Sequence, residues 1–260
     1  MATFLFDQTI FGPVISRRLG ISLGINLLPV DSKLCSFDCI YCECGWNPER
    51  KNNRVDLPSR EVVRSLLRQK LLEMAADSQL PDVITFAGNG EPTLHPDFDS
   101  IIVDTLLLRD ELTPKSRIAV LSNSTTLQKP RVVEALKKVD DNILKLDSGV
   151  LETIILLNKP VGRFDLEKLV LQLKQFNGAL TIQTMFLRGI FNGVEVDNTT
   201  DYEVEKWIGL LKEIQPGNVM IYSIARDTPA ENLYGVPLPE LEKIASRVEA
   251  ETSIPVQVSA

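Results

Sequence analysis

Six apolar, β-rich segments alternate along this chain with six segments of helical pattern, and this alternation restricts the possible folds most. The predicted strands are Ile21–Leu28, Val83–Ala87, Ile118–Ser122, Ile143–Asp147, Leu180–Leu187 and Val219–Ala225. The predicted helices are Ser59–Asp77, Asp99–Arg109, Pro130–Lys138, Asp165–Gln175, Asp201–Ile214 and Pro239–Ala250. Strands joined by such long crossovers pair in parallel. Because six units are too few for a closed eight-unit barrel, the α/β pattern predicts a partial (β/α)6 TIM-like barrel.

The first predicted helix, Ser59–Asp77, illustrates the helical pattern. Its apolar residues recur every three to four positions, which predicts a single buried stripe. The members of this stripe are Val62, Val63, Leu66, Leu67, Leu71 and Met74. Pro58 and Ser59 are typical of a helix start. Without an internal linker, repeat or low-complexity tract, we expect residues 1–260 to form a single domain.

The charge balance excludes a large basic surface. The chain has 28 Lys and Arg against 35 Asp and Glu, for a net charge of −7. This balance leaves too little positive surface to hold a nucleic-acid backbone over a long stretch. Apolar runs such as Ile154–Leu157 are far shorter than the ~20 residues that span a bilayer. The segment Met1–Thr9 has no basic start of a signal peptide. We therefore expect a cytoplasmic protein without a membrane segment.

All four cysteines lie within ten residues, at Cys35, Cys39, Cys42 and Cys44. Such crowding on one loop disfavours a disulfide framework and indicates a metal or cluster site. The first three follow C-x3-C-x2-C spacing, whereas zinc usually binds two separated C-x2-C pairs. Three thiolates can hold an iron–sulfur cubane and leave one iron open. The spacing favours the cluster, with Cys44 as an extra buried thiol; the alternative is a zinc-stabilised binding module that uses all four cysteines.

With Tyr41 just before its last cysteine, the motif resembles the signature of the radical S-adenosylmethionine (SAM) superfamily. The flanking segments Phe11–Gly20 and Phe86–Pro96 are similar to the iron–sulfur oxidoreductases related to wyosine-tRNA synthases. This resemblance implies a radical SAM core with a [4Fe–4S] cluster held by Cys35, Cys39 and Cys42. It also implies reductive cleavage of S-adenosyl-L-methionine to a 5′-deoxyadenosyl radical, which abstracts hydrogen from an unidentified substrate.

The same resemblance assigns cofactor contacts to the carboxyl ends of strands, where α/β folds collect ligands. The Gly-Gly-Glu-like segment would receive the amino group of SAM through backbone carbonyls and a carboxylate; its residues are Gly88, Asn89, Gly90 and Glu91. From composition alone, a simple strand-to-helix turn explains this segment equally well. Asn123, between Ser122 and Ser124, would contact the ribose hydroxyls; the alternative is a capping or Asx-turn role. The backbone beside Tyr41 would recognise adenine, while its ring covers the cluster.

Strand alternation places Lys145 and Asp147 on one face of the fourth predicted strand. The resemblance implies that Lys145 binds the SAM carboxylate and Asp147 the ribose or amino group; an architectural ion pair is the alternative. On the fifth strand, Thr181, Gln183 and Met185 share a face. We expect Gln183 to be the inward polar group there.

Four further residues have weaker assignments. Arg17 and Arg18 precede the first predicted strand; they are either ordinary surface charge, or one of them binds a carboxylate or phosphate in bidentate fashion. His95, followed by Pro96, is expected to be a turn histidine rather than a base. Arg226, after the sixth predicted strand, is either a substrate-side group or part of a capping network.

The resemblance also implies partners. A flavodoxin or ferredoxin is expected as the electron donor. A modified tRNA base is a possible substrate but is not favoured, because the tRNA-tailoring relatives carry a second cluster or an extra RNA-binding region. Four cysteines cannot supply a second cluster of three ligands, and the net charge disfavours RNA. Small molecules, peptides and proteins stay open as substrates.

Overall fold

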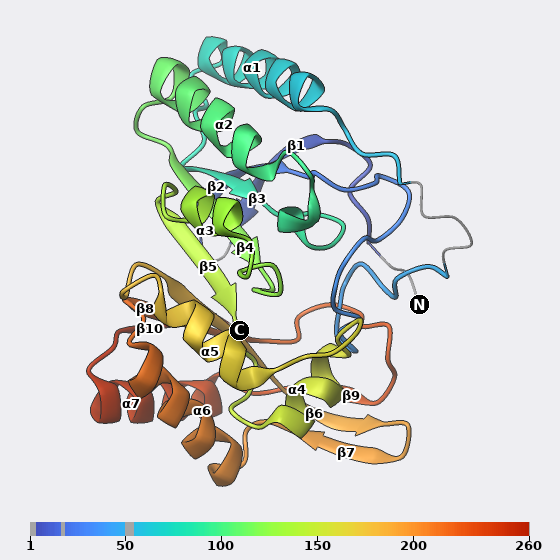
Figure 1. Cartoon of the computed structure of the whole chain (residues 1–260), viewed down its shortest axis with the longest axis vertical. Coiled ribbons are helices and arrows are strands. Elements are labelled where there is room, and N and C mark those ends of the chain that lie inside the picture. The colour runs from blue at the N-terminus through green and yellow to red at the C-terminus, as the bar shows by residue number, and fades with distance from the viewer. Residues whose placement is uncertain (1–3, 17–18, 50–54, 260) are drawn as a thin grey trace.

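A curved, mostly parallel sheet forms the body of the molecule (Figure 1). The computed structural model describes residues 4–16, 19–49 and 55–259. The strands are β1 (Ile10–Ser16), β2 (Gly20–Ile25), β3 (Val83–Phe86), β4 (Arg117–Ser122), β5 (Asp141–Lys145), β6 (Thr181–Phe191), β7 (Val194–Asp197), β8 (Asn218–Ser223), β9 (Leu233–Gly235) and β10 (Val256–Ser259). They follow the order β1-β2-β3-β4-β5-β6-β8-β10, and all neighbours pair in parallel except β1 and β2.

The helices lie along the outside of this sheet, with α1 and α2 over one end and α6 and α7 over the other (Figure 1). They are α1 (Arg60–Ala76), α2 (Phe98–Leu112), α3 (Pro130–Leu136), α4 (Leu151–Asn158), α5 (Leu166–Lys174), α6 (Asp201–Ile214) and α7 (Leu238–Thr252), with a short 3-10 turn, η1 (Pro92–Leu94). In the described part of the chain, none of them has the length and apolar character needed to cross a bilayer. The predicted partial barrel is confirmed, because the six predicted strands and six predicted helices all form.

The structure adds elements that the sequence pattern did not indicate. Strand β1 pairs antiparallel with β2, and β10 extends the parallel sheet beyond β8. Strand β6 continues to Phe191, past its predicted end at Leu187, because β7 and β9 supply antiparallel partners there. Helix α4 is built around the short apolar run Ile154–Leu157. Runs this short have no recognisable period, so neighbouring elements decide their conformation.

The predicted stripe of α1 is partly wrong. Four of its members are buried, namely Val63, Leu67, Leu71 and Met74. Val62 and Leu66 are 46% and 39% exposed, because the contact with the sheet and α2 covers a narrower face of the helix than the apolar pattern. The predicted start is confirmed: the Ser59 hydroxyl accepts a hydrogen bond from the backbone N–H of Val62.

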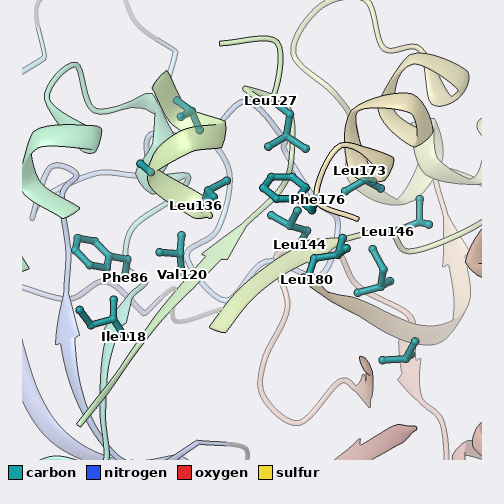
Figure 2. Close-up of a cluster of buried hydrophobic side chains, with 14 of the residues drawn as sticks. Phe86, Ile118, Val120, Leu127, Leu136, Leu144, Leu146, Leu173, Phe176 and Leu180 are labelled. Atoms are coloured by element: carbon teal, nitrogen blue, oxygen red, sulfur yellow. The ribbon is translucent and has the colours of Figure 1, made fainter. Parts of the chain in front are cut away.

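Alternation along the parallel strands divides the interior into two compartments. Outward-facing side chains pack beneath the helices in one large apolar cluster (Figure 2). Inward-facing Val83, Ala119, Ile143 and Met220 form a second, small cluster inside the curve of the sheet. This inner cluster fills the amino-terminal part of the barrel. The next inward positions therefore line a cavity toward the carboxyl ends of the strands.

The difference between neighbouring leucines of α1 predicts a difference in stability. Leu67→Ala should lower the free energy of unfolding by about 3 kcal/mol, because this side chain is fully buried and leaves a cavity. Leu66→Ala, the matched control, should cost less than about 1 kcal/mol. Urea unfolding followed by circular dichroism measures both; equal losses would contradict the observed orientation of α1.

Candidate functional site

A cavity of about 280 Å³ opens at the carboxyl ends of the parallel strands, above the inner apolar cluster. Its wall combines the cysteine loop with residues from the ends of β3, β4, β5, β6 and β8. Those strand-end residues include Gly88, Gly90, Glu91, Leu121, Asn123, Lys145, Gln183, Met185 and Tyr222. All four cysteines line the same cavity. The fold therefore brings the predicted cluster motif and most of the predicted SAM contacts together.

The cysteine loop is joined to the end of β3 through Leu34. The Leu34 N–H donates to the carbonyl of Asn89 at 2.8 Å, and the Glu91 N–H donates to the carbonyl of Leu34 at 3.0 Å. Gly90, between them, has φ +139°, and a Cβ atom there would lie 1.9 Å from the Leu34 oxygen. Only glycine fits this position. The segment that packs closely against the backbone of Gly90 is therefore the protein's own cysteine loop.

The loop is also held from within by Lys33. Its ammonium donates to Asp38 Oδ1 at 3.1 Å and to the carbonyl of Gly45 at 2.9 Å. Asn47 N–H donates to the same Asp38 oxygen at 2.8 Å, and the Asn47 side chain accepts from the Cys35 N–H at 3.0 Å. These bonds join the residues before, between and after the cysteines. Asn47, three residues after Cys44, thus helps to order the cysteine loop.

Nitrogen donors point at the sulfurs of Cys35 and Cys39. Cys35 Sγ accepts from the Phe37 N–H and from Asn123 Nδ2, each at 3.4 Å. Cys39 Sγ accepts from Asn158 Nδ2 at 3.4 Å. Such donors stabilise thiolates and are typical partners of cluster sulfurs.

Burial raises the pKa of the Cys35 thiol to about 12 and that of Cys39 to about 11. Both thiols therefore stay protonated at neutral pH until a metal centre displaces their protons.

Cys42 and Cys44 form a distinct pair. The Cys44 thiol lies 3.5 Å from the carbonyl oxygen of Gly88, its hydrogen-bond acceptor. Hydrogen bonding with this neighbour lowers the pKa of Cys42 to about 6, whereas the same contact raises that of Cys44. Cys44 thus supports a motif cysteine and the end of β3 at once. A structural thiol, as predicted, accounts for these contacts.

The donor set fits an iron–sulfur cluster better than a single zinc ion. The ligands of one tetrahedral zinc lie within about 4 Å of each other, because each Zn–S bond is about 2.3 Å. In residues 4–16, 19–49 and 55–259, no group of three or more His, Cys, Asp or Glu side chains is arranged around a single metal position. A cubane is larger and needs its ligands spread along a wall. Cys35, Cys39 and Cys42 all line one cavity.

Glu91 reaches the cavity wall, but its carboxylate is engaged by protein donors. Oε1 accepts from the Thr93 N–H at 3.1 Å and from the Ser122 hydroxyl at 2.9 Å, and Oε2 accepts from the Asn123 N–H at 2.6 Å. Burial raises the pKa of this carboxyl group. Glu91 caps η1 and ties it to the end of β4. The strand-to-helix turn is thus present, and a contact of Glu91 with SAM stays a prediction.

Two asparagines predicted to bind the cofactor have other partners. Asn89 is fully buried, and its amide donates to the carbonyls of Phe6 and Pro29, both at 2.8 Å. Asn89 is not among the lining residues, and its carbonyl accepts from the Leu34 N–H, so a contact of Asn89 with SAM stays a prediction. Asn123 does line the cavity, but its amide donates to Cys35 and to the Ser36 hydroxyl at 2.9 Å. Its position links β4 to the cysteine loop.

A buried polar network surrounds Lys145 and Asp147. The Tyr41 hydroxyl donates to Asp147 Oδ2, and the Lys145 ammonium donates to the Tyr41 oxygen at 2.9 Å. Asn158 Nδ2 donates to Asp147 Oδ2 at 2.6 Å, and Met185 N–H donates to Oδ1 at 3.0 Å. Burial lowers the pKa of Lys145, but Asp147 and Tyr222 raise it by more. Lys145 is therefore a charged group on the cavity wall.

Asp147 does not share the cavity with Lys145. Strand β5 ends at Lys145, so the alternation that predicted a common face stops before Asp147. The Asp147 side chain is fully buried and forms an ion pair with Lys145 at 3.4 Å. The architectural ion pair considered for this sequence is present, and the predicted direct contact of Asp147 with SAM is not supported by this placement.

Gln183 is the polar side chain that the cavity leaves unpaired. It is 6% exposed and lines the cavity from β6, as predicted. Within the described residues, its carboxamide forms no hydrogen bond to the protein. Its amide faces the cavity, where a ligand can supply the hydrogen-bond partners that the protein does not. Gln183 is therefore suited to contact a bound molecule.

Two further predicted residues, His95 and Arg226, are not among the residues that line the cavity. His95 is confirmed as a turn histidine: Nδ1 accepts from the Asp97 N–H at 3.1 Å, so Nε2 donates to the Pro58 carbonyl at 2.9 Å. Burial lowers its pKa. Arg226 forms an exposed ion pair with Glu43 at 2.7 Å. Arg17 and Arg18 lie outside the described residues.

Sequence reasoning missed several residues that build the site, above all Lys33, Asp38, Asn47 and Asn158. Two of them had a signal in the sequence. Lys33 lies just before the motif and Asp38 lies inside it, where a charged residue needs a partner. Asn158 and Asn47 had no such signal, because asparagine is common at helix ends and in turns. Their roles depend on contacts between distant segments.

The model of the radical SAM superfamily matches residues 30–149 of this chain. A UPF0026 protein, slr1464 of Synechocystis, is 31% identical over 227 residues, which are 85% of this chain and 77% of that protein. A protein named GTPase Obg from Brachyspira hyodysenteriae is 30% identical over 258 residues, which are 98% of this chain. The chain spans 35% of the length of that second relative.

A solved structure with the same fold is that of TYW1, a wyosine synthase, with a lysine-pyruvate adduct bound. The matched region covers 89% of this chain and 74% of the TYW1 chain, with a TM-score of 0.62 and 16% sequence identity. At this identity the likeness concerns the fold.

The polar network predicts that the Tyr41 hydroxyl stabilises the protein. Tyr41→Phe removes one donor to Asp147 and the acceptor of Lys145 and Asn158, so the free energy of unfolding should fall by about 1–3 kcal/mol. Tyr234→Phe is the matched control, since Tyr234 is 61% exposed, and it should change by less than about 0.5 kcal/mol. Urea unfolding under anaerobic conditions measures both. If the two variants are equally stable, the network does not stabilise the fold.

Proposed function

Because the chain belongs to the radical SAM superfamily and to the family of UPF0026 proteins, we propose that it is a radical SAM enzyme. Cys35, Cys39 and Cys42 would hold a [4Fe–4S] cluster, and SAM would bind beside it in the cavity. When bound, the two cofactors supply reductive cleavage of the SAM sulfonium, which yields methionine and a 5′-deoxyadenosyl radical able to abstract hydrogen from a substrate.

The observation that carries this proposal is the shared cavity. Three thiols with C-x3-C-x2-C spacing face the same space of about 280 Å³ as a charged lysine and an unpaired glutamine. Amide donors already point at Cys35 and Cys39. A structural metal site would be closed, whereas this one adjoins room for a ligand.

Each wall residue has a role that follows from its surroundings. Lys145 keeps its charge through Asp147, and its position is set by Tyr41, so it can bind the carboxylate of SAM. Gln183 can donate to and accept from a bound molecule. Because protein donors occupy Glu91 and the carbonyl of Gly88, we propose that the backbone carbonyl of Gly90 offers the acceptor for the amino group. The inner apolar cluster closes the cavity floor to water.

A zinc-stabilised binding module that uses all four cysteines is the weaker candidate. It needs Cys44 as a ligand, but the Cys44 thiol donates to the backbone carbonyl of Gly88. It also leaves the unpaired Gln183 and the charged Lys145 without a function.

The partners follow from the proposed chemistry. We propose a low-potential one-electron donor, a flavodoxin or ferredoxin. The substrate is left unassigned, and a tRNA stays possible but not favoured, because 28 basic residues face 35 acidic ones. GTP is not proposed despite the name of one relative, since the sequence contains no Gly-Lys pair of the kind that a phosphate-binding loop requires.

The proposal predicts which cysteines are essential. The anaerobically reconstituted protein should contain about four irons with sulfide, as expected for a cubane, and should release 5′-deoxyadenosine from SAM in the presence of dithionite. Replacing Cys35, Cys39 and Cys42 together with alanine should abolish both. Cys44→Ala, the matched control, should keep the cluster and most of the cleavage. Iron analysis and chromatography of the nucleoside products measure these outcomes.

Two results would contradict the proposal. A triple variant that still cleaves SAM would remove the cysteines from the reaction. A colourless protein with one zinc that is lost in Cys44→Ala would favour the binding module.

A further inference from the structure

A lysine side chain is enclosed inside the cysteine loop. Lys33, two residues before the first motif cysteine, has a side chain that is only 1% exposed. A buried ammonium group is costly unless it is paired and hydrogen-bonded. Lys33 meets this condition by donating to Asp38 and to the carbonyl of Gly45. The loop thus keeps a full positive charge away from solvent, directly beside the predicted cluster ligands.

The negative partner of Lys33 is less enclosed. Asp38 lies between Cys35 and Cys39, and its side chain is 21% exposed. Its Oδ1 accepts from Lys33 and from the backbone and side chain of Asn47. Water screens an exposed charge more than a buried one. At the centre of the loop, the field of Lys33 is therefore cancelled only in part by Asp38.

A neutral side chain could brace the same loop. Gln or Met at position 33 would fill similar volume, and a Gln amide could still donate to Gly45 or Asp38. What only lysine provides is the charge. Its enclosure therefore indicates an electrostatic function in addition to packing.

We infer that Lys33 is a positioning residue that makes the bound cluster easier to reduce. Reduction adds one electron from an external low-potential donor, so the reduced cluster and its three thiolates carry one more negative charge than the oxidised form. A fixed buried cation stabilises the more negative state, and charges around a cluster are known to set its potential. This inference rests on the proposed function, because it requires a cluster held by Cys35, Cys39 and Cys42.

The test is the midpoint potential of the reconstituted cluster, measured by dithionite titration with electron paramagnetic resonance. Lys33→Gln should shift the potential to a more negative value. Asp38→Asn, which removes the opposing charge, should shift it to a more positive value. Lys115→Gln is the control and should leave the potential unchanged, because Lys115 is exposed at the amino end of β4. Iron and sulfide content are measured for every variant.

The opposite signs separate an effect of charge from distortion of the loop. If Lys33→Gln holds a full cluster at an unchanged potential, or if both variants shift in the same direction, the inference is wrong. If Lys33→Gln fails to assemble a cluster, the result for Asp38→Asn decides. A midpoint potential in Asp38→Asn that is not higher than that of the wild-type protein overturns the inference. A wild-type protein that binds no iron refutes the proposed function instead.

Discussion

The backbone pairing of the cysteine loop with the end of β3 is the contact on which the site depends. Leu34 exchanges hydrogen bonds with Asn89 and Glu91 across Gly90, and no larger residue fits there. This pairing extends the parallel sheet by one short bridge. It holds three cysteines over the carboxyl ends of the strands, where parallel α/β folds bind ligands. Without it, the thiols and the strand-end residues would not face one cavity.

Two lysine–aspartate pairs then place positive charge at the site. Lys145 and Asp147 form one pair at the end of β5, and Lys33 and Asp38 form the other within the loop. In each pair the surrounding hydrogen bonds offset part of the cost of burial. Lys145 faces the cavity, whereas Lys33 lies behind the cysteines. By our proposals, Lys145 contacts the ligand, and Lys33 raises the reduction potential of the cluster.

Much of the architecture could be predicted because the pattern is regular. Strand and helix alternation located the six central units, and their parallel order followed from the length of the crossovers. The prediction was poorer wherever a neighbour decides the outcome. Val62 and Leu66 have the right spacing for burial in α1 but lie outside the contact. Strands β7, β9 and β10 are short or peripheral and depend on the partners that β6 and β8 supply.

The sequence by itself determined the identity of the cluster motif and the cavity edge, because the spacing of three cysteines and the positions of strand ends are local properties. Only the tertiary structure decided which polar residues reach the cavity. Asn89, Asp147 and Glu91 have the chemistry of ligand-binding groups, but other parts of the protein take up their hydrogen bonds. Gln183 keeps its bonds unfilled because its neighbours in the barrel are apolar or already paired. Whether a buried polar group finds hydrogen-bond partners depends on residues far apart in the chain, and the spacing of residues along the sequence does not encode which of them come together.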